Sequence, residues 1–273
     1  MATFVFFHAH PDDEAIGTAG TMAAAAQAGR RVVAVFATRG ERGEVPADLA
    51  PHASLGELRE SEARRAGRIL GAHRVAFLGY EDSGDDPAAV PSGSFAVADV
   101  DRAGRALADL LEEEDADVLV TYDPTGWTKH PDHLQVHRVG RRAADLAARR
   151  PHLYETALAV SQLGRLLRLA TPAGGEPPDT GLFAIPDAEL TALDIRPWLG
   201  LKRAALAAHA SQIPPESFFR TLSDPDFAEV WGVEYYLDRD ADRSGPGPLE
   251  AALEASTVNE NRADAHEHRG ADT

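Results

Sequence analysis

The chain has 273 residues, a formal net charge of −17 and no cysteine, and these properties exclude several classes of protein. The acidic balance argues against binding to a nucleic-acid backbone, which needs clustered lysine and arginine. The absence of cysteine excludes disulfides, thiolate zinc sites and a cysteine nucleophile, so any metal must be held by histidine and carboxylate side chains. The length suits one large α/β domain.

The sequence also indicates where the protein works. Its first residues carry no basic segment followed by a long apolar run, and its apolar runs are shorter than the roughly 20 residues that span a bilayer. We therefore expect a cytoplasmic protein with no membrane span, no nucleic-acid partner and a small-molecule substrate. The oligomeric state is left open, a homo-oligomer included.

Apolar segments and helix-compatible segments alternate along the first half of the chain. The apolar runs predict strands that are buried on both faces, and the segments between them have helical spacing. Strands are predicted at residues 4–7, 31–37, 74–78 and 117–122, and helices at residues 17–28, 55–70, 99–114 and 131–149. This alternation predicts a Rossmann-like α/β fold with a largely parallel sheet, helices on both faces and right-handed crossovers.

The pattern is weaker beyond residue 150. Residues 152–161 and 231–236 predict two more strands, and residues 201–210 predict a helix. The chain turns polar beyond Asp238. We therefore expect a single catalytic domain over residues 1–238 and a smaller C-terminal extension, a polar and disordered tail over residues 239–273.

Two clusters of ionisable side chains stand where predicted strands end. The first is His10-Pro-Asp-Asp-Glu14, and the second is His130-Pro-Asp-His133, which follows the strand ending at Tyr122. Ligand sites in open α/β sheets lie at the carboxyl ends of strands. If the two strands are neighbours in the sheet, the two clusters face each other across one edge.

Together the clusters contain the residue types that a metal-dependent hydrolase needs. Two imidazoles and one carboxylate are a recurring zinc-binding set, and His10, Asp13 and His133 can supply it. A carboxylate beside the metal, but not bound to it, must then take the proton of the attacking water. Asp12 is the candidate for this general base.

An amide under attack also needs a hydrogen-bond donor for the developing oxyanion, and a protonated His130 held by Asp132 or another carboxylate can provide it. Simpler interpretations remain open. Either His-Pro-Asp turn can cap a helix, and His137, one turn beyond His133, can form a zinc pair with it or stand on a helix face. A receiver-like protein with an acidic Mg²⁺ site is a further alternative, although two histidines among three ligands favour zinc.

The paired motifs resemble those of the PIG-L/LmbE-like family of zinc-dependent N-acetylglucosaminyl deacetylases. This family includes the deacetylases of mycothiol and bacillithiol synthesis and the related mycothiol-conjugate amidase. The resemblance extends roughly from Phe4 to Tyr236. Its supporting segments are Thr38-Arg-Gly-Glu41-Arg-Gly43, Arg59-x-x-Glu62, Leu78-x3-Asp82-Ser-Gly84 and Ala-His209-Ala-Ser-Gln212.

The resemblance implies a metal centre and a base. By position in the motifs, His10, Asp13 and His133 bind one Zn²⁺ per chain, or another divalent transition metal in its place. Asp12 matches the general base of the family.

The resemblance implies further roles around this centre. His130, paired with Asp132, matches the residue that stabilises the oxyanion or protonates the leaving amine. Glu41 and Asp82 match family positions near the sugar, and Arg59 matches a recurrent arginine of the pocket wall. These three are the candidates for substrate binding.

One segment departs from the family pattern. Several sugar deacetylases of the family have a Gly-Tyr-Gly-like segment just before the second motif, where this chain has Trp127-Thr128-Lys129. A tyrosine that can approach the reacting carbonyl is therefore missing there. We expect the chemistry to be retained and Trp127 to bind substrate, as an apolar wall against an acyl group or a sugar face.

The expected function is that of a zinc-dependent hydrolase that removes an acyl group, most simply acetyl, from an N-acylated amino sugar or related amide. An amidase that acts on a larger conjugate, such as a mycothiol-type adduct or a natural product, shares the mechanism and is the alternative. A non-catalytic metal-binding module is a second alternative, but the loss of a ligand or of the base that would mark it is not found. Substrate selection is expected in the loops at residues 41–54, 80–94 and 171–186.

Overall fold

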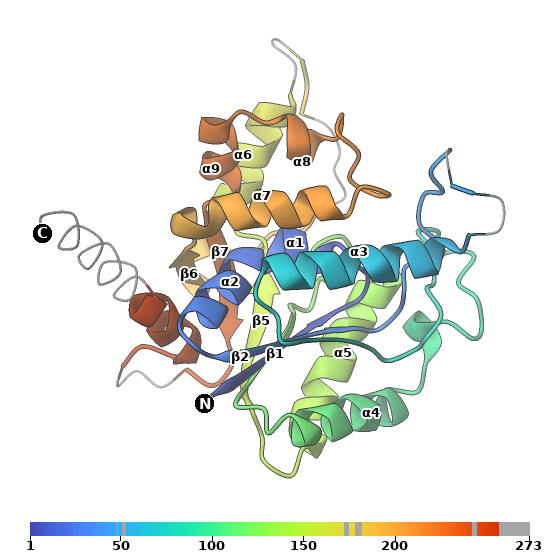
Figure 1. Ribbon diagram of the computed structural model, residues 1–273, viewed down its shortest axis with the longest axis vertical. Coiled ribbons are helices and arrows are strands. Elements are labelled where there is room, and N and C mark those ends of the chain that lie inside the picture. Colours follow the sequence, from blue (N-terminus) through green and yellow to red (C-terminus); the bar gives the residue numbers. More distant parts are fainter. Residues whose placement is uncertain (48, 51–52, 172–174, 178–181, 242–244, 257–273) are drawn as a thin grey trace, which may run out of the picture.

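The computed structural model describes residues 1–47, 49–50, 53–171, 175–177, 182–241 and 245–256 (Figure 1). Within these ranges, no helix is long and apolar enough to cross a bilayer. The strands are β1 (Thr3–His8), β2 (Arg31–Phe36), β3 (Arg74–Phe77), β4 (Val118–Tyr122), β5 (His152–Ala157), β6 (Thr191–Asp194) and β7 (Val233–Asp238). The helices are α1 (Asp13–Gly17), α2 (Ala19–Gln27), α3 (Leu55–Ile69), α4 (Val100–Glu113), α5 (Pro131–Leu146), α6 (Val160–Ala170), α7 (Leu199–Ala208), α8 (Phe218–Thr221) and α9 (Asp224–Trp231), with short 3₁₀ helices at Phe95–Val97, Asp187–Glu189 and Arg196–Trp198.

The strands form one sheet in the order β3-β2-β1-β4-β5-β7-β6. The first five strands in this order are parallel to one another, whereas β7 is antiparallel to both β5 and β6. The prediction of an α/β fold with a largely parallel sheet is therefore confirmed. The antiparallel end of the sheet arises in the half of the chain where the sequence pattern is weak.

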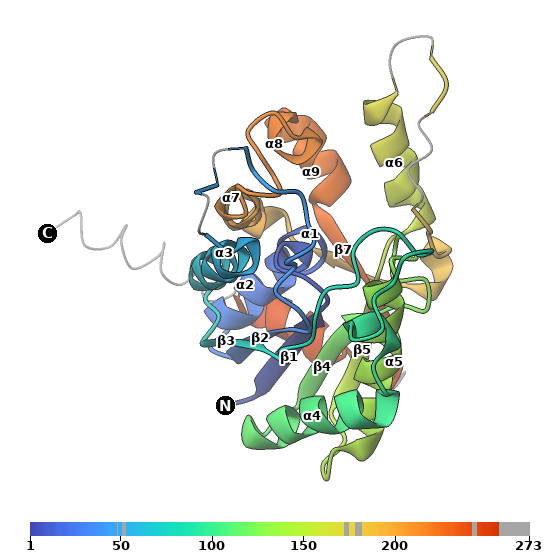
Figure 2. The ribbon, with the colours of Figure 1, turned by 90° about the vertical axis from the view of Figure 1, so that its right-hand side faces the viewer.

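Alternation along the central strand β1 fills both faces of the sheet, because successive side chains of a strand point to opposite faces. Phe4 and Phe6 pack on one side with Met22 of α2, and Phe7 packs on the other with Leu107 of α4. Figure 2 shows α2 and α3 on one side of the sheet and α4 and α5 on the other. The prediction of helices on both faces is confirmed, and it explains why β1 is apolar at every position from residue 4 to residue 7.

The helix predicted at residues 17–28 is present as α2, and the predicted turn before it forms a separate short helix, α1, so that the helix breaks at Thr18. Small residues at the break allow close contact with neighbouring side chains: a Cβ atom on Gly17 would lie 2.4 Å from Trp127, and one on Gly20 would lie 2.4 Å from Ile195. The new helix start is satisfied by Glu234 of β7, whose carboxylate accepts hydrogen bonds from the backbone N–H groups of Gly20 and Thr21, both at 2.9 Å. The break therefore results from tertiary packing.

Part of the segment expected to be a tail is ordered. Residues 248–256 form a helix, in which Leu249 and Ala252 are fully buried in the core on the α2 side of the sheet. The hydroxyl of Tyr154 also donates to Glu250 at 3.1 Å. The physical reason is that three apolar positions on one helix face suffice to hold a short polar segment on the domain. The other parts of the predicted tail at residues 242–244 and 257–273 lie outside the described residues.

A buried ion pair ties the second half of the chain to the first. Lys202 of α7 is fully buried, and its ammonium donates to Glu234 Oε1 at 2.8 Å and to the carbonyl of Ile16 at 2.7 Å. Since Glu234 also caps α2, this pair joins α1, α2, α7 and β7. Removal of one partner of such a pair leaves a buried charge without compensation.

We expect the variant Lys202→Met to lose about 3 kcal/mol of unfolding free energy, because breaking a buried ion pair costs about 3–5 kcal/mol. Urea denaturation followed by circular dichroism measures this loss. The control is Arg196→Met, which removes an exposed pair with Asp194 and should change stability by less than about 1 kcal/mol. Equal, small losses in both variants would show that the buried pair does not hold the two halves together.

Candidate active site

The two polar clusters lie side by side at the carboxyl ends of β1 and β4. These strands pair in parallel, with Phe6 opposite Val120, so the turns that follow them meet at one edge of the sheet. The first turn carries His10 to Glu14, and the second cluster, His130 to His133, opens helix α5. The predicted convergence is confirmed, since Asp13 Oδ1 lies 3.4 Å from His133 Nε2.

Asp13 lies between His10 and His133, and one of its carboxylate oxygens faces each ring. Asp13 lies 3.4 Å from His133 Nε2 through Oδ1 and 3.6 Å from His10 Nδ1 through Oδ2. The other nitrogen of each ring is engaged: His133 Nδ1 donates to the carbonyl of Gly126 at 3.0 Å, and His10 Nε2 donates to Asp132 at 3.1 Å. In the neutral rings, the nitrogens that face Asp13 are therefore the ones left with a lone pair for a metal ion.

This donor set fits a metal ion. Zinc bonds to nitrogen and oxygen at about 2.0–2.2 Å, so two donors of a tetrahedral site stand about 3.4 Å apart. Asp13 approaches this spacing with a different oxygen for each ring, Oδ1 at 3.4 Å from His133 Nε2 and Oδ2 at 3.6 Å from His10 Nδ1. Ring nitrogens of His10, His130 and His133 also lie within 4.8 Å of one another, and a second group, which adds Asp82 and Asp132 to His10 and His130, meets the same limit.

The electrostatics around His10 favour a cation. Burial lowers the pKa of this imidazole, but hydrogen bonds and charge from Asp13, Asp132 and Asp82 raise it well above its usual value. Asp82 Oδ1 lies 3.5 Å from His10 Nε2, so three buried carboxylates surround the ring. Surroundings that stabilise an added proton also stabilise a metal cation in its place.

His130 differs from the expectation of a protonated residue paired with Asp132. Its Nδ1 accepts a hydrogen bond from the backbone N–H of Asp132 at 3.1 Å, so this nitrogen carries no proton. Burial and the nearby rings of His10 and His133 lower the pKa of His130 to about 4. The ring is thus neutral, with its Nε2–H 3.4 Å from Asp85, because the carboxylate of Asp132 is engaged by His10 and by the backbone N–H of Ser83.

Asp12 occupies a backbone conformation that few residues other than glycine adopt. Its φ angle is 112°. The side chain points to Arg59, whose Nη2 donates to Asp12 Oδ2 at 3.2 Å and to the carbonyl of Pro11 at 2.7 Å, while Nη1 donates to the carbonyl of Gly40 at 2.7 Å. Burial raises the pKa of Asp12 to about 6, although the charge of Arg59 opposes this. The guanidinium therefore holds both the carboxylate and the strained turn.

His209 and Gln212, from the second half of the chain, contact this turn and the loop at Glu44, and their individual roles were not predicted. Glu14 accepts from the backbone N–H of Asp12 at 3.0 Å and contacts His209 Nε2 at 2.6 Å. Gln212 bonds both the N–H and the carbonyl of Glu44, at 3.1 and 2.8 Å. The segment that contains His209 and Gln212 was noted in the sequence only as support for the family resemblance. The packing of α7 on α1 and α3 shows what the two residues contact.

Two of the predicted sugar-binding residues contact each other. Glu41 is exposed and accepts from the backbone N–H of Asp82 at 3.1 Å. Asp82 is buried, and it accepts from the backbone N–H groups of Arg42 and Gly84 at 3.1 and 2.8 Å. Asp82 and Arg59 line a cavity beside His10, whereas Glu41 supports the loop behind it.

Trp127 lies against the second cluster. Its indole stacks on Tyr122 with a centroid separation of 4.6 Å and meets the ring of His133 edge-on at 5.8 Å. Its Nε1 donates to the carbonyl of Thr156 at 3.1 Å. The side chain also covers Gly17, where no Cβ atom fits. The indole is therefore fixed at the edge of the site, with its φ angle at 63°.

The remaining histidines of the two motifs have other partners. His137 Nδ1 donates to the carbonyl of Tyr122 at 2.9 Å and lies 3.5 Å from Glu155. His8 is fully buried, 3.2 Å from the hydroxyls of Tyr122 and Thr18. Both therefore hold the helices and strands that carry the site.

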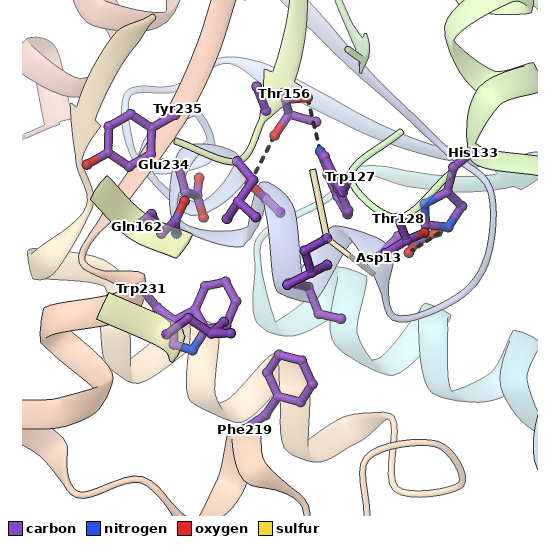
Figure 3. Close-up of a pocket in the computed structure, with 16 residues that line it drawn as sticks. Asp13, Trp127, Thr128, His133, Thr156, Gln162, Phe219, Trp231, Glu234 and Tyr235 are labelled. Atoms are coloured by element: carbon purple, nitrogen blue, oxygen red, sulfur yellow. Dashed lines mark hydrogen bonds and ion pairs between the residues drawn. The ribbon is translucent and has the colours of Figure 1, made fainter. Parts of the chain in front are cut away.

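A polar cavity and an apolar cavity meet at the donor cluster, which is the name used here for His10, Asp13 and His133. One has a volume of about 330 Å³ and is lined by polar groups, among them His10, Asp12, Arg59, Asp82 and Gln212. The other has a volume of about 230 Å³, and its lining contains many apolar side chains (Figure 3). His133 lines both cavities. The cluster can thus act on a bond between a polar and an apolar part of a ligand.

Comparison with known proteins identifies relatives and folds. The 1D-myo-inositol 2-acetamido-2-deoxy-alpha-D-glucopyranoside deacetylase of Salinispora arenicola is 39% identical over 267 residues, which cover 88% of this chain and 86% of the relative. The N,N'-diacetylchitobiose deacetylase of Pyrococcus horikoshii is 24% identical, with a TM-score of 0.53 over 84% of this chain and 73% of that one.

The fold alone does not select a reaction. The 4-carboxy-2-hydroxymuconate hydratase of Pseudomonas putida has a TM-score of 0.58 at 20% identity, covering 90% of this chain and 100% of that one. The sequence is more selective, because the profile of the PIG-L family, described as GlcNAc-PI de-N-acetylase, matches residues 5–144 and hence half of the chain. By that match and by its identity to the Salinispora deacetylase, the chain belongs to the PIG-L family.

Proposed function

We propose that the protein is a zinc-dependent deacetylase that removes the acetyl group from an N-acetylglucosamine-containing small molecule. The observation that carries the proposal is the carboxylate of Asp12 beside the donor set of His10, Asp13 and His133, at a cavity with polar walls. The names of the relatives, which are deacetylases of such sugars, support it.

His10, Asp13 and His133 would hold one ion per chain. Imidazole and carboxylate donors suit zinc, and they also accept other divalent transition metals. When bound, the ion supplies a lowered pKa for a water molecule, towards about 7, and polarises the carbonyl of the substrate. The contacts of Gly126 and Asp132 to the far nitrogens of the two rings fix the orientation of the donors.

Asp12 acts as the general base. Its carboxylate accepts a proton from the attacking water, whose oxygen forms the new bond to the acyl carbon. The C–N bond then breaks, and the proton goes to the amine nitrogen, so that acetate and the free amino sugar are released. Arg59 and Glu14 hold Asp12 in its left-handed backbone conformation, and its carboxylate lines the same cavity as His10 and His133.

His130 stabilises the oxyanion as a neutral donor. Because Nδ1 accepts a backbone hydrogen bond, the proton of the ring is on Nε2, and this N–H borders the polar cavity. A donor that is already oriented lowers the energy of the developing negative charge without reorganisation. Asp132 contributes indirectly through two groups. Its carboxylate orients His10, and its own backbone N–H sets the tautomer of His130.

The polar cavity binds the sugar. Arg59, Asp82, Glu44 and Gln212 bring charged and amide groups to its walls, and hydroxyl groups of a sugar need partners of this kind. Glu41 positions Asp82 through the backbone contact at 3.1 Å. The substrate class named for the Salinispora relative, an inositol glycoside of N-acetylglucosamine, is the first compound to test.

Removal of metal tests the centre. Dialysis against a chelator should abolish acetate release, and one equivalent of Zn²⁺ should restore it. The variant His133→Ala should lose metal affinity by at least about 100-fold, whereas His137→Ala, on the same helix but directed to Tyr122, should keep it. Elemental analysis of the purified variants measures this, and equal metal content in both would contradict the ligand assignment.

The variant Asp12→Asn tests the base. It should retain metal and lower kcat by about 10³-fold, because general-base catalysis contributes about 10²–10⁴-fold. Asp145→Asn, on the exposed surface of α5, is the control that should keep wild-type kcat. Steady-state acetate release measures both variants. A metal-loaded Asp12→Asn enzyme with wild-type kcat would remove Asp12 from the mechanism.

The variant Arg59→Lys tests how the base is positioned. Lysine keeps the charge but cannot bridge Asp12, Pro11 and Gly40 at once, so kcat should fall by about 10–100-fold. Metal content should be unchanged, because Arg59 does not contact the donor set. An effect on KM alone would instead assign Arg59 to substrate binding.

A further inference from the structure

The second cavity is bounded by large apolar side chains and reaches the donor cluster. Its volume is about 230 Å³, and its lining extends from Asp13 and His133 at one end to Phe219 and Trp231 at the other (Figure 3). Its lining also includes Ile16, Trp127, Leu158 and Leu166. Neither the donor set nor the base accounts for an apolar space of this size next to the reacting centre.

The polar groups in the walls of this cavity are largely engaged within the protein. Glu234 is bonded by Lys202 and by the start of α2, and Gln162 Nε2 donates to the carbonyl of Val230 at 3.0 Å. The hydroxyl of Tyr235 accepts from Arg165 at 3.1 Å. The indole N–H of Trp231 is buried without a partner in the part of the chain that the structure describes. A sugar placed here would leave most of its hydroxyl groups unpaired, whereas a hydrocarbon chain would not.

The two cavities thus fit the two sides of an amide. The amine side of the substrate, a sugar, requires the polar cavity with Arg59 and Asp82. With the amide carbon at the donor cluster, the acyl side then points past Asp13 and His133 into the apolar cavity. An acetyl group fills only a small part of that space.

We infer that the apolar cavity is a subsite for an acyl chain and that the enzyme hydrolyses N-acyl amino sugars with chains longer than acetyl. This inference rests on the proposed function, since it extends the substrate of the same site. One water in the liquid takes up about 30 Å³, and a methylene group is of similar size, so 230 Å³ holds about six to eight carbon atoms. Water attacks the acyl carbon, the C–N bond breaks, and the products are the fatty acid and the amino sugar.

A chain-length series tests the subsite. N-acetyl, N-butyryl, N-hexanoyl, N-octanoyl and N-dodecanoyl derivatives of one glucosaminide are compared by the rate of release of the free amine. Each buried methylene contributes up to about fourfold, so kcat/KM for hexanoyl should exceed that for acetyl by at least about tenfold. The value should fall again for dodecanoyl, which is longer than the cavity.

Variants of the wall show where the chain binds. Leu158→Trp narrows the cavity and should lower the hexanoyl-to-acetyl ratio of kcat/KM by at least about tenfold, while Phe219→Ala should move the best chain to a greater length. Phe218→Ala is the matched control, because Phe218 is the neighbour of Phe219 on α8 but does not line the cavity, and it should leave the ratio unchanged. Circular dichroism of each variant confirms that it is folded.

The outcomes separate the inference from the function on which it rests. Release of acetate with a ratio that is flat or falls with chain length would refute the subsite and leave the deacetylase proposal intact. Failure of the metal-loaded enzyme to cleave any compound of the series would refute the proposed function and the subsite together. A rising ratio that responds equally to Phe218→Ala and Phe219→Ala would refute the assignment to this cavity.

Discussion

The site depends on the parallel pairing of β1 with β4. The two strands are neighbours at the centre of the sheet, so the turns that leave their carboxyl ends meet, although 122 residues separate His10 from Asp132. Asp13 links the two turns at this junction of β1 and β4, because its carboxylate lies 3.6 Å from His10 and 3.4 Å from His133. A change in the register of either strand by one residue would reverse the faces of its side chains and separate these donors.

Around this junction, buried charged side chains lie in pairs or groups of opposite charge. Carboxylates surround His10, a guanidinium faces Asp12, and a histidine from the end of α7 faces Glu14. Each of these charges is compensated by a named partner, as buried ions require. The helix that precedes His209 is itself held by Lys202 and Glu234, so the second half of the chain stabilises the turn that carries Asp12, the proposed base.

The same junction separates two chemical environments. His133 stands at the boundary, with the polar cavity on one side and the apolar cavity on the other. Trp127 belongs to this boundary: it stacks on Tyr122 and packs on Gly17, and these contacts hold the indole as a wall of the apolar cavity beside His133. Since the fold is shared with a hydratase, the arrangement of these side chains, and not the sheet, carries the functional argument.

The alternation of strands and helices, the largely parallel sheet and the two polar turns could be predicted from the sequence, because they depend on local periodicity and on residue types at strand ends. Three features required the folded chain: Asp132 orients His10 rather than His130, Arg59 faces Asp12, and an apolar cavity adjoins His133. The tertiary structure also placed the helix at residues 248–256 on the core. The physical reason is that hydrogen-bond partners and cavities depend on contacts between residues far apart in the chain, and these leave no periodic signal in the sequence.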